Sequence, residues 1–279
     1  MKTKLDYFIE NFGIDKINTM TKYPSILTYH NLGPRGSLVN SLVEDKNFHD
    51  NKIFLTEKVD GSNTRIVFFT NFYGQISDYF IGTREDILYA CGDRIINQSQ
   101  HAVATVKNIA DDIVGKTFNS KLLQNTIYCL YGENYGGNIN GFKQYTSTKT
   151  FNIRFFDLSV MSYDTASELL ENNIDRISSW REHGGQDFVP VDQFNDFCKK
   201  FSLERVPYIK ETVGTEIPND LQGVWDWMQQ FKTSNAVIDS DYNGTRFAEG
   251  VVVRTADRKM IRKIRFEDYE RTKRIGLIY

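Results

Sequence analysis

Short runs of β-branched and aromatic residues predict that the first half of the chain consists mainly of strands. Two such runs, 53–59 and 64–69, flank the polar, turn-forming sequence Asp60-Gly61-Ser62-Asn63. Further apolar runs of strand length occur at 79–83, 126–131, 152–158, 250–254 and 260–265. We expect these strands to form antiparallel sheets.

Apolar residues spaced three and four positions apart predict helices in two other parts of the chain. Residues 97–113 place Val103, Val106, Ala110 and Ile113 on one face. Between about 162 and 232 the same spacing recurs, and Thr165-x-x-Glu168 has the pattern of a capping box. The repeated apolar positions there are Leu170, Ile174, Ile177 and Trp180, then Phe194, Phe197, Cys198 and Phe201, then Leu221, Val224, Trp225 and Met228. We therefore expect an α+β fold with a helical insertion at 162–232.

The composition is that of a globular protein, and it narrows the functional classes. The 279 residues are 40% hydrophobic and 25% charged, and no apolar run approaches the ~20 residues of a membrane span. The first residues lack the apolar stretch of a secretory signal. Three widely spaced cysteines, Cys91, Cys129 and Cys198, argue against a disulfide framework, and the four histidines lack zinc-ligand spacing. These features indicate a soluble protein of a reducing compartment, with no membrane partner.

The net charge is close to zero, but the charge is unevenly distributed. The chain has 34 Lys and Arg against 36 Asp and Glu, a formal net charge of −2. Between residues 254 and 274, however, nine Lys and Arg stand against four acidic residues. A solvated face is the ordinary explanation of such a run. A basic strip on an otherwise acidic body is also typical of a polyanion site confined to one cleft.

The most specific chemical motif is Lys58-Val59-Asp60-Gly61-Ser62-Asn63, at the end of an expected strand. An isolated lysine there would usually be a solvated edge residue, and the residues after it would form only a turn. Gly61, however, lets the backbone approach a ligand closely, and the N–H groups of such a turn can face phosphate. Lysine attacks phosphorus only as the free amine, so a nucleophilic lysine needs burial or nearby positive charge.

Five further fragments place charged or aromatic residues at the ends of expected strands, in a fixed order. They are Gly82-Thr83-Arg84-Glu85, Tyr131-Gly132-Glu133, Phe155-Phe156-Asp157-Leu158, Glu249-Gly250-Val251-Val252-Val253 and Lys263-Ile264-Arg265. Together with the Lys58 motif, this order resembles the covalent nucleotidyltransferase superfamily of ATP-dependent ligases and capping enzymes. Two details are similar to RNA ligases of the phage double-strand-sealing and trypanosome-editing type: Glu57-Lys58 followed by Gly-Ser-Asn, and the lead-in Lys22-Tyr23-Pro24-Ser25-Ile26. The resemblance extends from Lys22 to Tyr269.

The resemblance implies a nucleotidyltransferase (ATP-grasp-like ligase) core of antiparallel sheets with flanking helices. It implies that Lys58 attacks the α-phosphate of ATP and carries AMP as a phosphoramidate. Glu57 would lie beside the adenine edge, and Phe156 would stack on the base. Arg84 and Glu133 would hold the ribose or a nearby phosphate.

The resemblance also implies how the phosphates are held. Glu249 would bind a catalytic Mg²⁺ or Mn²⁺, and Lys263 would contact the α-phosphate in the transition state. Arg265 stands where many relatives have a second lysine, so the charge is kept but the geometry of the contact changes. Lys259 and Arg262 compete for the same phosphate contacts. The turn around the nucleophile would be lined by Asp60, Gly61 and Asn63.

On this resemblance, the expected activity is that of an ATP-dependent RNA ligase. The enzyme would adenylylate its own lysine, transfer AMP to an RNA 5′-phosphate and join that end to a 3′-hydroxyl. The basic strip at 254–274 and exposed aromatic residues would contact the RNA. Only 14 residues follow Arg265, so we expect a single domain at 1–279 without the C-terminal OB-fold or helical domain of related enzymes. We expect a monomer in the cytoplasm (of the host, for a viral chain), assisted by an accessory RNA-binding domain or protein.

Three other functions share this order of motifs. A capping-type guanylyltransferase would use GTP in place of ATP. A DNA ligase of the same superfamily would differ in the strand that it seals. An RNA-end-binding module without catalytic activity would keep the fold and form no lysine–nucleotide adduct.

Individual residues of the motifs also have simpler explanations. Phe155 rather than Phe156 could face the base, and either ring alone is more often part of a core. Glu133 could merely hydrogen-bond a turn. Arg84 could pair with Glu85 or Asp86 at the surface, a contact of little energetic consequence. We favour the functional interpretation because these explanations would have to hold together, in the superfamily's order.

Overall fold

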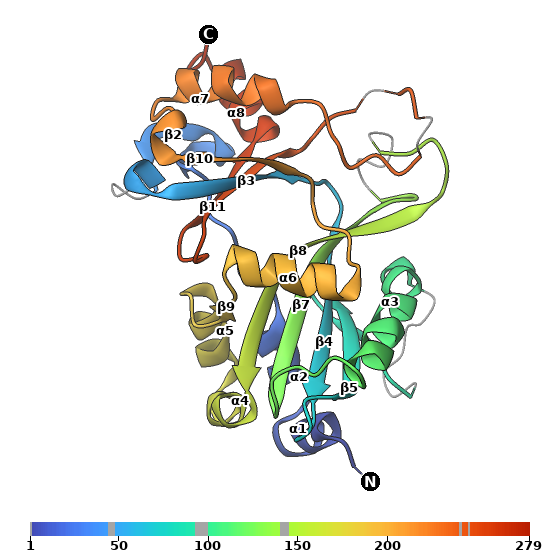
Figure 1. Ribbon diagram of the computed structural model, residues 1–279. Helices are drawn as coiled ribbons and strands as arrows, with labels where there is room; N and C mark the ends of the chain where they lie inside the picture. Colours follow the sequence, from blue (N-terminus) through green and yellow to red (C-terminus); the bar gives the residue numbers. More distant parts are fainter. Residues whose placement is uncertain (1, 44–47, 93–99, 140–144, 240–241, 245) are drawn as a thin grey trace.

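The structure is a computed structural model of the chain, and it describes residues 2–43, 48–92, 100–139, 145–239, 242–244 and 246–279. Two antiparallel sheets lie one above the other in Figure 1, with helices packed around both. Within the described ranges, no helix is long and apolar enough to cross a membrane.

The larger sheet has six antiparallel strands in the order β6-β5-β4-β7-β8-β9. Their bounds are Ile87–Ala90 (β6), Ile76–Thr83 (β5), Ser62–Thr70 (β4), Thr126–Gly136 (β7), Phe151–Ser162 (β8) and Asp187–Phe188 (β9). Successive residues of β4 point to opposite faces, so Ile66 and Phe68 enter one hydrophobic core while Val67 and Phe69 enter another. Burial on both faces explains why this strand is a continuous apolar run.

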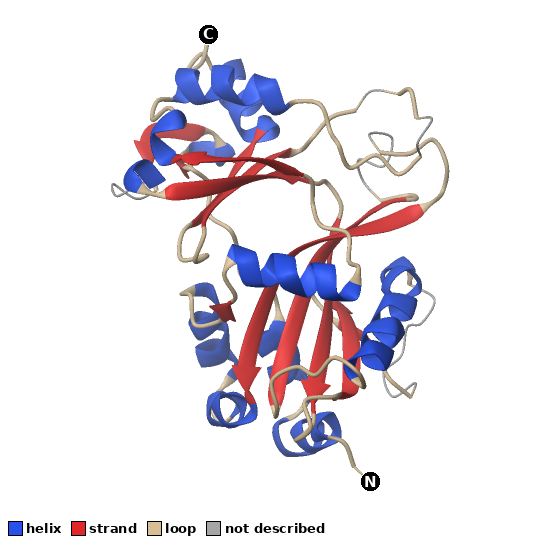
Figure 2. Cartoon of the chain, in the orientation of Figure 1, coloured by secondary structure: helices blue, strands red, loops and turns tan. Residues whose placement is uncertain are grey.

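Helices cover both faces of the larger sheet (Figure 2). On the face of Ile66 and Phe68 lie α3 (His101–Thr117) and α6 (Val191–Phe201). On the opposite face lie α1 (Lys4–Phe12), α2 (Ile14–Thr21), α4 (Tyr163–Leu170) and α5 (Ile174–Glu182). Helix α1 begins with a capping box, because the Thr3 hydroxyl accepts from the Asp6 N–H and the Asp6 carboxylate accepts from the Thr3 N–H.

The smaller sheet has four antiparallel strands in the order β10-β3-β11-β12. Their bounds are Tyr208–Val213 (β10), Lys52–Lys58 (β3), Gly250–Thr255 (β11) and Ile261–Arg265 (β12). Leu55 of β3 and Val253 of β11 face a third core, which α7 (Leu221–Met228) and α8 (Phe266–Arg274) cover. A hairpin of β1 (His30–Leu32) and β2 (Leu38–Leu42) packs beside these helices. The short 3₁₀ turns are η1 (Pro34–Gly36), η2 (Phe48–Asp50), η4 (Gly214–Glu216) and η5 (Gln229–Phe231).

The strands expected from the apolar runs are all present within a few residues of the expected bounds, as β3, β4, β5, β7, β8, β11 and β12. The expected mixture of antiparallel sheets and flanking helices is therefore confirmed. The helix expected at 97–113 is α3, which begins at His101 and extends to Thr117. Residues 97–99 of that expectation lie outside the described residues.

The segment 162–232 differs from the expected insertion. It contains α4 to α7, but it also supplies β10, which pairs with β3 and so belongs to the smaller sheet. The capping box at Thr165 is wrong, because the N-cap of α4 is Ser162, whose hydroxyl accepts from the Thr165 N–H. Helix α4 ends at Leu170, and a new helix starts after the N-cap Asn173. The apolar spacing continues across this break, so periodicity could not locate it.

Candidate active site

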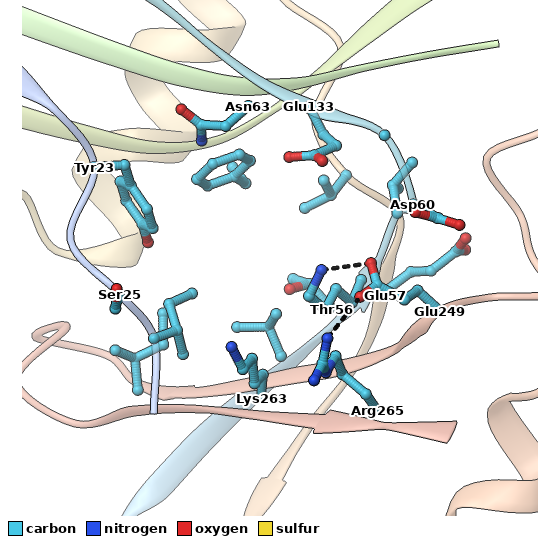
Figure 3. A pocket seen from close by; sticks show the side chains of 18 of the residues that line it. Tyr23, Ser25, Thr56, Glu57, Asp60, Asn63, Glu133, Glu249, Lys263 and Arg265 are labelled. Carbon is cyan, nitrogen blue, oxygen red and sulfur yellow. Dashed lines mark hydrogen bonds and ion pairs between the residues drawn. The ribbon is translucent and has the colours of Figure 1, made fainter. Parts of the chain in front are cut away.

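A pocket lies between the two sheets, where the ends of several strands come together (Figure 3). Its cavity volume is about 420 Å³, a size typical of sites for small molecules and cofactors. In Figure 3, Asn63 and Glu133 lie across the cavity from Lys263 and Arg265, and the segment that carries Tyr23 closes one side. The wall is therefore built from both sheets and from the N-terminal part of the chain.

Every residue that the sequence predicted for the site lines this one pocket. These residues are Glu57, Lys58, Asp60, Gly61, Asn63, Arg84, Glu133, Phe156, Glu249, Lys263 and Arg265. Lys259 and Arg262, the alternatives for the phosphate contacts, do not line it. The fold thus brings together residues from both ends of the sequence, while the role of each remains a prediction.

Lys58 is the last residue of β3, and its ammonium lies 2.5 Å from a carboxylate oxygen of Glu249. The backbone sets this up, because the Glu249 N–H donates to the Lys58 carbonyl at 3.1 Å, just before β11 begins. The other Glu249 oxygen is 3.9 Å from Arg265, whose guanidinium donates twice to Asp268. With Lys263 nearby, three cations surround one carboxylate, an arrangement that can neutralise a polyphosphate.

Burial and neighbouring charges shift the pKa values of several pocket side chains. Burial, reinforced by the carboxylates of Glu249 and Asp60, raises the pKa of Glu133 to about 8. Burial also raises the pKa of Asp60. Burial lowers the pKa of Lys263, and the cations Arg265 and Lys58 lower it further. Shifts of this kind are concentrated at functional sites.

The carboxylate of Glu57 is buried and already hydrogen-bonded within the protein. The Ser234 hydroxyl donates to one oxygen, and the Asn235 N–H donates to the other at 2.8 Å. Burial raises the pKa of Glu57. Glu57 thus borders the pocket and anchors the chain that follows α7. Its expected contact with the adenine edge remains a prediction.

The two adjacent phenylalanines of β8 have different environments. Phe155 is 1% exposed in the core beneath α6, whereas Phe156 lines the pocket. The alternative in which Phe155 faces the ligand is therefore wrong. Val252 and Ile261 line the pocket from the smaller sheet, so a planar base finds apolar surface on both sheets.

Residues 22–29 form a wall that the sequence indicated only as a lead-in motif. The Lys263 N–H donates to the Leu27 carbonyl at 2.9 Å, and the Tyr29 N–H donates to the Lys263 carbonyl at 3.0 Å. This segment therefore extends the smaller sheet beyond β12. The main pocket residues that sequence reasoning missed are Tyr23, Ser25, Thr56, Val206 and Val252. All five are uncharged side chains, and the lead-in motif already contained Tyr23 and Ser25.

The basic segment 254–274 is not a continuous exposed strip. Arg254, Arg258 and Arg262 are 4%, 9% and 8% exposed. Arg258 donates to the buried carboxylate of Asp157 at 2.7 Å, Arg254 lies 3.5 Å from it, and the Tyr23 hydroxyl donates to it at 2.8 Å. These bonds join the two sheets. Arg258 and Arg262 are thus buried away from the pocket, whereas Arg254 lines it. The expectation that this segment contacts RNA stays a prediction.

Glu249 is a carboxylate of this pocket that could hold a divalent metal ion. In the described part of the chain, no three His, Cys, Asp or Glu side chains are grouped so as to hold a metal. Glu249 stands beside the cations of the pocket. Mg²⁺ is commonly held by one or two carboxylates together with substrate phosphates and water. The residues present therefore fit a metal that arrives with a nucleotide, and they do not form a protein cage.

Comparisons with known proteins identify a family and a shared fold. The model of the RNA ligase family matches residues 51–274. A solved RNA ligase of Naegleria gruberi, a glutamate-to-alanine mutant with ATP and Mn, matches with a TM-score of 0.52 and 14% identity, over 91% of this chain and 63% of that chain. The same ligase with PPi gives a TM-score of 0.50 and 14% identity, over 90% and 64%. An apo mutant of that ligase gives a TM-score of 0.50 and 15% identity, over 92% of this chain and 59% of that chain.

These structural matches show a shared fold. The chain spans less than two thirds of the length of the Naegleria gruberi ligase chains that it matches. A comparison with curated protein sequences finds no match.

Proposed function

Because this chain belongs to the RNA ligase family, we propose that it is an ATP-dependent RNA ligase with a covalent nucleotidyltransferase core. It adenylylates Lys58, transfers the AMP to an RNA 5′-phosphate and joins that end to a 3′-hydroxyl. The Naegleria gruberi ligase of the same fold was solved with ATP and Mn. ATP together with Mg²⁺ or Mn²⁺ are the cofactors that we propose for this chain.

The observation that carries the proposal is the position of Lys58 among the charged groups of the pocket. Its Nζ lies at the end of β3 against Glu249, with Lys263 and Arg265 on β12. After the ammonium gives up a proton to solvent, Nζ attacks the α-phosphorus of ATP. A P–N bond forms, the bond to the β-phosphate oxygen breaks, and pyrophosphate leaves with the electron pair. Lys263 and Arg265 neutralise the charge on the phosphates during this step.

The turn after β3 packs closely against β7 and lines the pocket beside the nucleophile. The Asp60 N–H donates to the Tyr145 hydroxyl at 2.7 Å, which fixes the turn. A Cβ on Gly61 would lie 2.4 Å from the carbonyl oxygen of Asn134, so only glycine fits there. With Asn63, these residues line the space beside the nucleophile.

The remaining pocket residues recognise the nucleoside. Phe156 stacks on the adenine, and Glu57 contacts the base edge. Glu133 and Arg84 hold the ribose and an adjacent phosphate. A carboxyl group whose pKa is raised to about 8 can both donate to and accept from a ribose hydroxyl near neutral pH.

Glu249 is the residue that would hold the metal ion. When bound there, the ion supplies positive charge at the phosphates and helps Lys58 to react as the free amine. Because Glu249 also pairs with Lys58, this carboxylate must exchange its partner before the lysine can attack.

The later steps use the same residues on a polynucleotide. An oxygen of the RNA 5′-phosphate attacks the phosphorus of the adenylylated lysine, and the P–N bond breaks with return of the proton to Lys58. The 3′-hydroxyl of a second end then attacks the activated 5′-phosphate, and AMP leaves. Binding of the RNA phosphates weakens as salt rises. We propose that the enzyme acts as a cytoplasmic monomer, with an accessory RNA-binding domain or protein to hold the substrate.

The test is covalent labelling of the purified protein, freed of bound nucleotide, with α-labelled ATP or GTP and Mg²⁺ or Mn²⁺. We expect an acid-labile labelled band from ATP only. Lys58→Ala should abolish the band and leave the melting temperature nearly unchanged, because Lys58 is a partly exposed strand-end residue. Lys52→Ala is the matched control, since Lys52 begins the same strand and pairs with the surface residue Glu211. It should label as the wild type does.

Three outcomes would contradict the proposal. Label from GTP in place of ATP would assign capping chemistry. Sealing of DNA ends but not RNA ends by the labelled protein would assign a DNA ligase. No label from either nucleotide, in protein that is folded and binds RNA ends, would assign a non-catalytic module.

A further inference from the structure

Arg65 of β4 is fully buried next to the pocket without lining it. It lies two residues after Asn63 on the same strand, so both side chains point to the same face of the sheet. Asn63 is paired with Glu133, and Arg65 is paired with Gly82 on one side and Tyr131 on the other. The guanidinium therefore occupies the row of side chains directly behind the pocket wall.

The hydrogen bonds of Arg65 go to neutral oxygens. Its Nη1 donates to the carbonyl of Thr83, and its Nη2 donates to the side-chain oxygen of Asn18. Its Nε has no partner within the described part of the chain. A buried cation with only neutral partners is costly. A stabilising role alone therefore does not account for a buried arginine at this position. The groups that Arg65 holds in place give a better explanation.

Arg65 and Asn18 together hold the backbone on either side of Arg84. Arg65 binds the carbonyl of Thr83, the residue before it. The amide of Asn18 continues the chain of bonds, because its Nδ2 donates to the carbonyl of Glu85 at 2.7 Å. The turn is closed by a hydrogen bond from the Thr83 N–H to the Asp86 carbonyl at 2.9 Å. Arg84 is thus the only residue between two clamped carbonyls.

Gly82 makes room for this arrangement. A Cβ at position 82 would lie 3.1 Å from the Cζ of Arg65 and 2.7 Å from the carbonyl oxygen of Asp86. Any larger residue would displace either the guanidinium or the turn. Gly82 is therefore needed for Arg65 to reach the turn that carries Arg84.

Asn18 also connects Arg84 with the opposite wall of the pocket. Helix α2, which carries Asn18, ends at Thr21 and leads into Lys22 and Ser25. Lys22 pairs with Glu85 at 3.3 Å, and the Arg84 Nη2 donates to the Ser25 hydroxyl at 3.3 Å. Glu85 is thus occupied by Lys22 rather than by Arg84.

We propose that Arg65 and Asn18 are positioning residues that aim Arg84 at the bound nucleotide, an inference that rests on the proposed lysine adenylylation. Neither side chain touches the substrate. They hold the carbonyls of Thr83 and Glu85, so that Arg84 projects into the pocket in one orientation. If they act only through Arg84, their removal has no further effect once Arg84 is gone.

A double-mutant cycle on the rate of Lys58 adenylylation tests this. The proteins are the wild type, Arg84→Ala, Asn18→Ala and the double variant, each measured in a single turnover with ATP. Asn18→Ala should slow the reaction about tenfold, and the double variant should be no slower than Arg84→Ala alone. Arg65→Met should behave as Asn18→Ala does. Asn18 is the safer substitution because its side chain is only partly buried.

Asn31→Ala is the matched control, since the Asn31 amide donates to the carbonyl of Leu42 in the distant β1–β2 hairpin. Combined with Arg84→Ala, it should show no coupling. The proposal is overturned if the effects of Asn18→Ala and Arg84→Ala multiply, because Asn18 would then act independently of Arg84. A wild-type protein that forms no adduct would instead refute the proposed function, and this inference with it.

Discussion

The Nζ of Lys58 lies 2.5 Å from Glu249, a residue 191 positions later in the sequence. The nucleophile that we propose and the carboxylate that we propose for the metal are thus partners of each other. Since an ammonium held by a carboxylate has no free electron pair, binding of the nucleotide and its metal must separate the two. On the proposed mechanism, Glu249 pairs with Lys58 before the reaction and holds the metal ion during it.

Glu249→Gln should leave the fold intact and slow adenylylation by at least about 100-fold, because a charged group at the reacting phosphates is lost. The free energy of unfolding should change by less than about 1 kcal/mol, as is usual for ion pairs near the surface. Single-turnover labelling over a range of Mg²⁺ concentrations and denaturant unfolding measure the two quantities. If Glu249→Gln adenylylated at the wild-type rate, Glu249 would have no role in the reaction.

Phe155→Ala and Phe156→Ala should have opposite consequences although the two residues are neighbours. Phe155→Ala leaves a cavity in the core and should cost about 3–5 kcal/mol of stability. Phe156→Ala should weaken ATP binding about 10- to 100-fold, the loss of one stacked ring, and change stability much less. Each variant serves as the control for the other. Unchanged ATP affinity of Phe156→Ala would show that the base binds elsewhere.

Asp157→Asn should strongly destabilise the protein, because it leaves Arg254 and Arg258 as buried cations without a counter-charge. We expect a loss of about 3–5 kcal/mol in urea unfolding. Asp257→Asn is the control, since Asp257 is exposed and pairs with the exposed Lys259. It should change stability by less than about 1 kcal/mol. Equal effects of the two substitutions would mean that the buried ion pairs do not stabilise the contact between the sheets.

Glu133 should make stability depend on pH in the absence of nucleotide. Burial, reinforced by Glu249 and Asp60, raises its pKa from 4.5 to about 8, so the folded state binds the proton more tightly than the unfolded chain. Its contribution to the free energy of unfolding is therefore fully present below about pH 4.5 and is lost as pH rises through about 8. Glutamine does not titrate, so the stability of Glu133→Gln has no such dependence on pH from this position.

The measurement is the melting temperature of wild type and Glu133→Gln across that pH range. The variant should become increasingly more stable than the wild type as pH rises through the window. A difference that is constant with pH would show that Glu133 titrates normally in the folded protein.

Local pattern predicted the strands well and the helical segment less well. The apolar runs of β3 and β4 reflect which faces each strand buries, and they are visible in near neighbours along the chain. The break between α4 and α5 depends on the caps Ser162 and Asn173. The pairing of β10 with β3 depends on residues more than 150 positions apart. Neither feature changes the local hydrophobic period.

Motif order in the sequence was enough to name eleven of the residues that line the pocket, because charged and aromatic side chains at strand ends are recognisable without coordinates. Tertiary structure alone decided that Phe156 and not Phe155 faces the cavity, that Glu57 is bonded to Ser234, and that Arg254 and Arg258 turn inward to Asp157. It alone placed Asn18 and Arg65 around Arg84. The physical reason is that residue type and spacing determine which chemical groups stand at the end of a strand. Strand register and the packing of one sheet on another determine which partner each side chain meets.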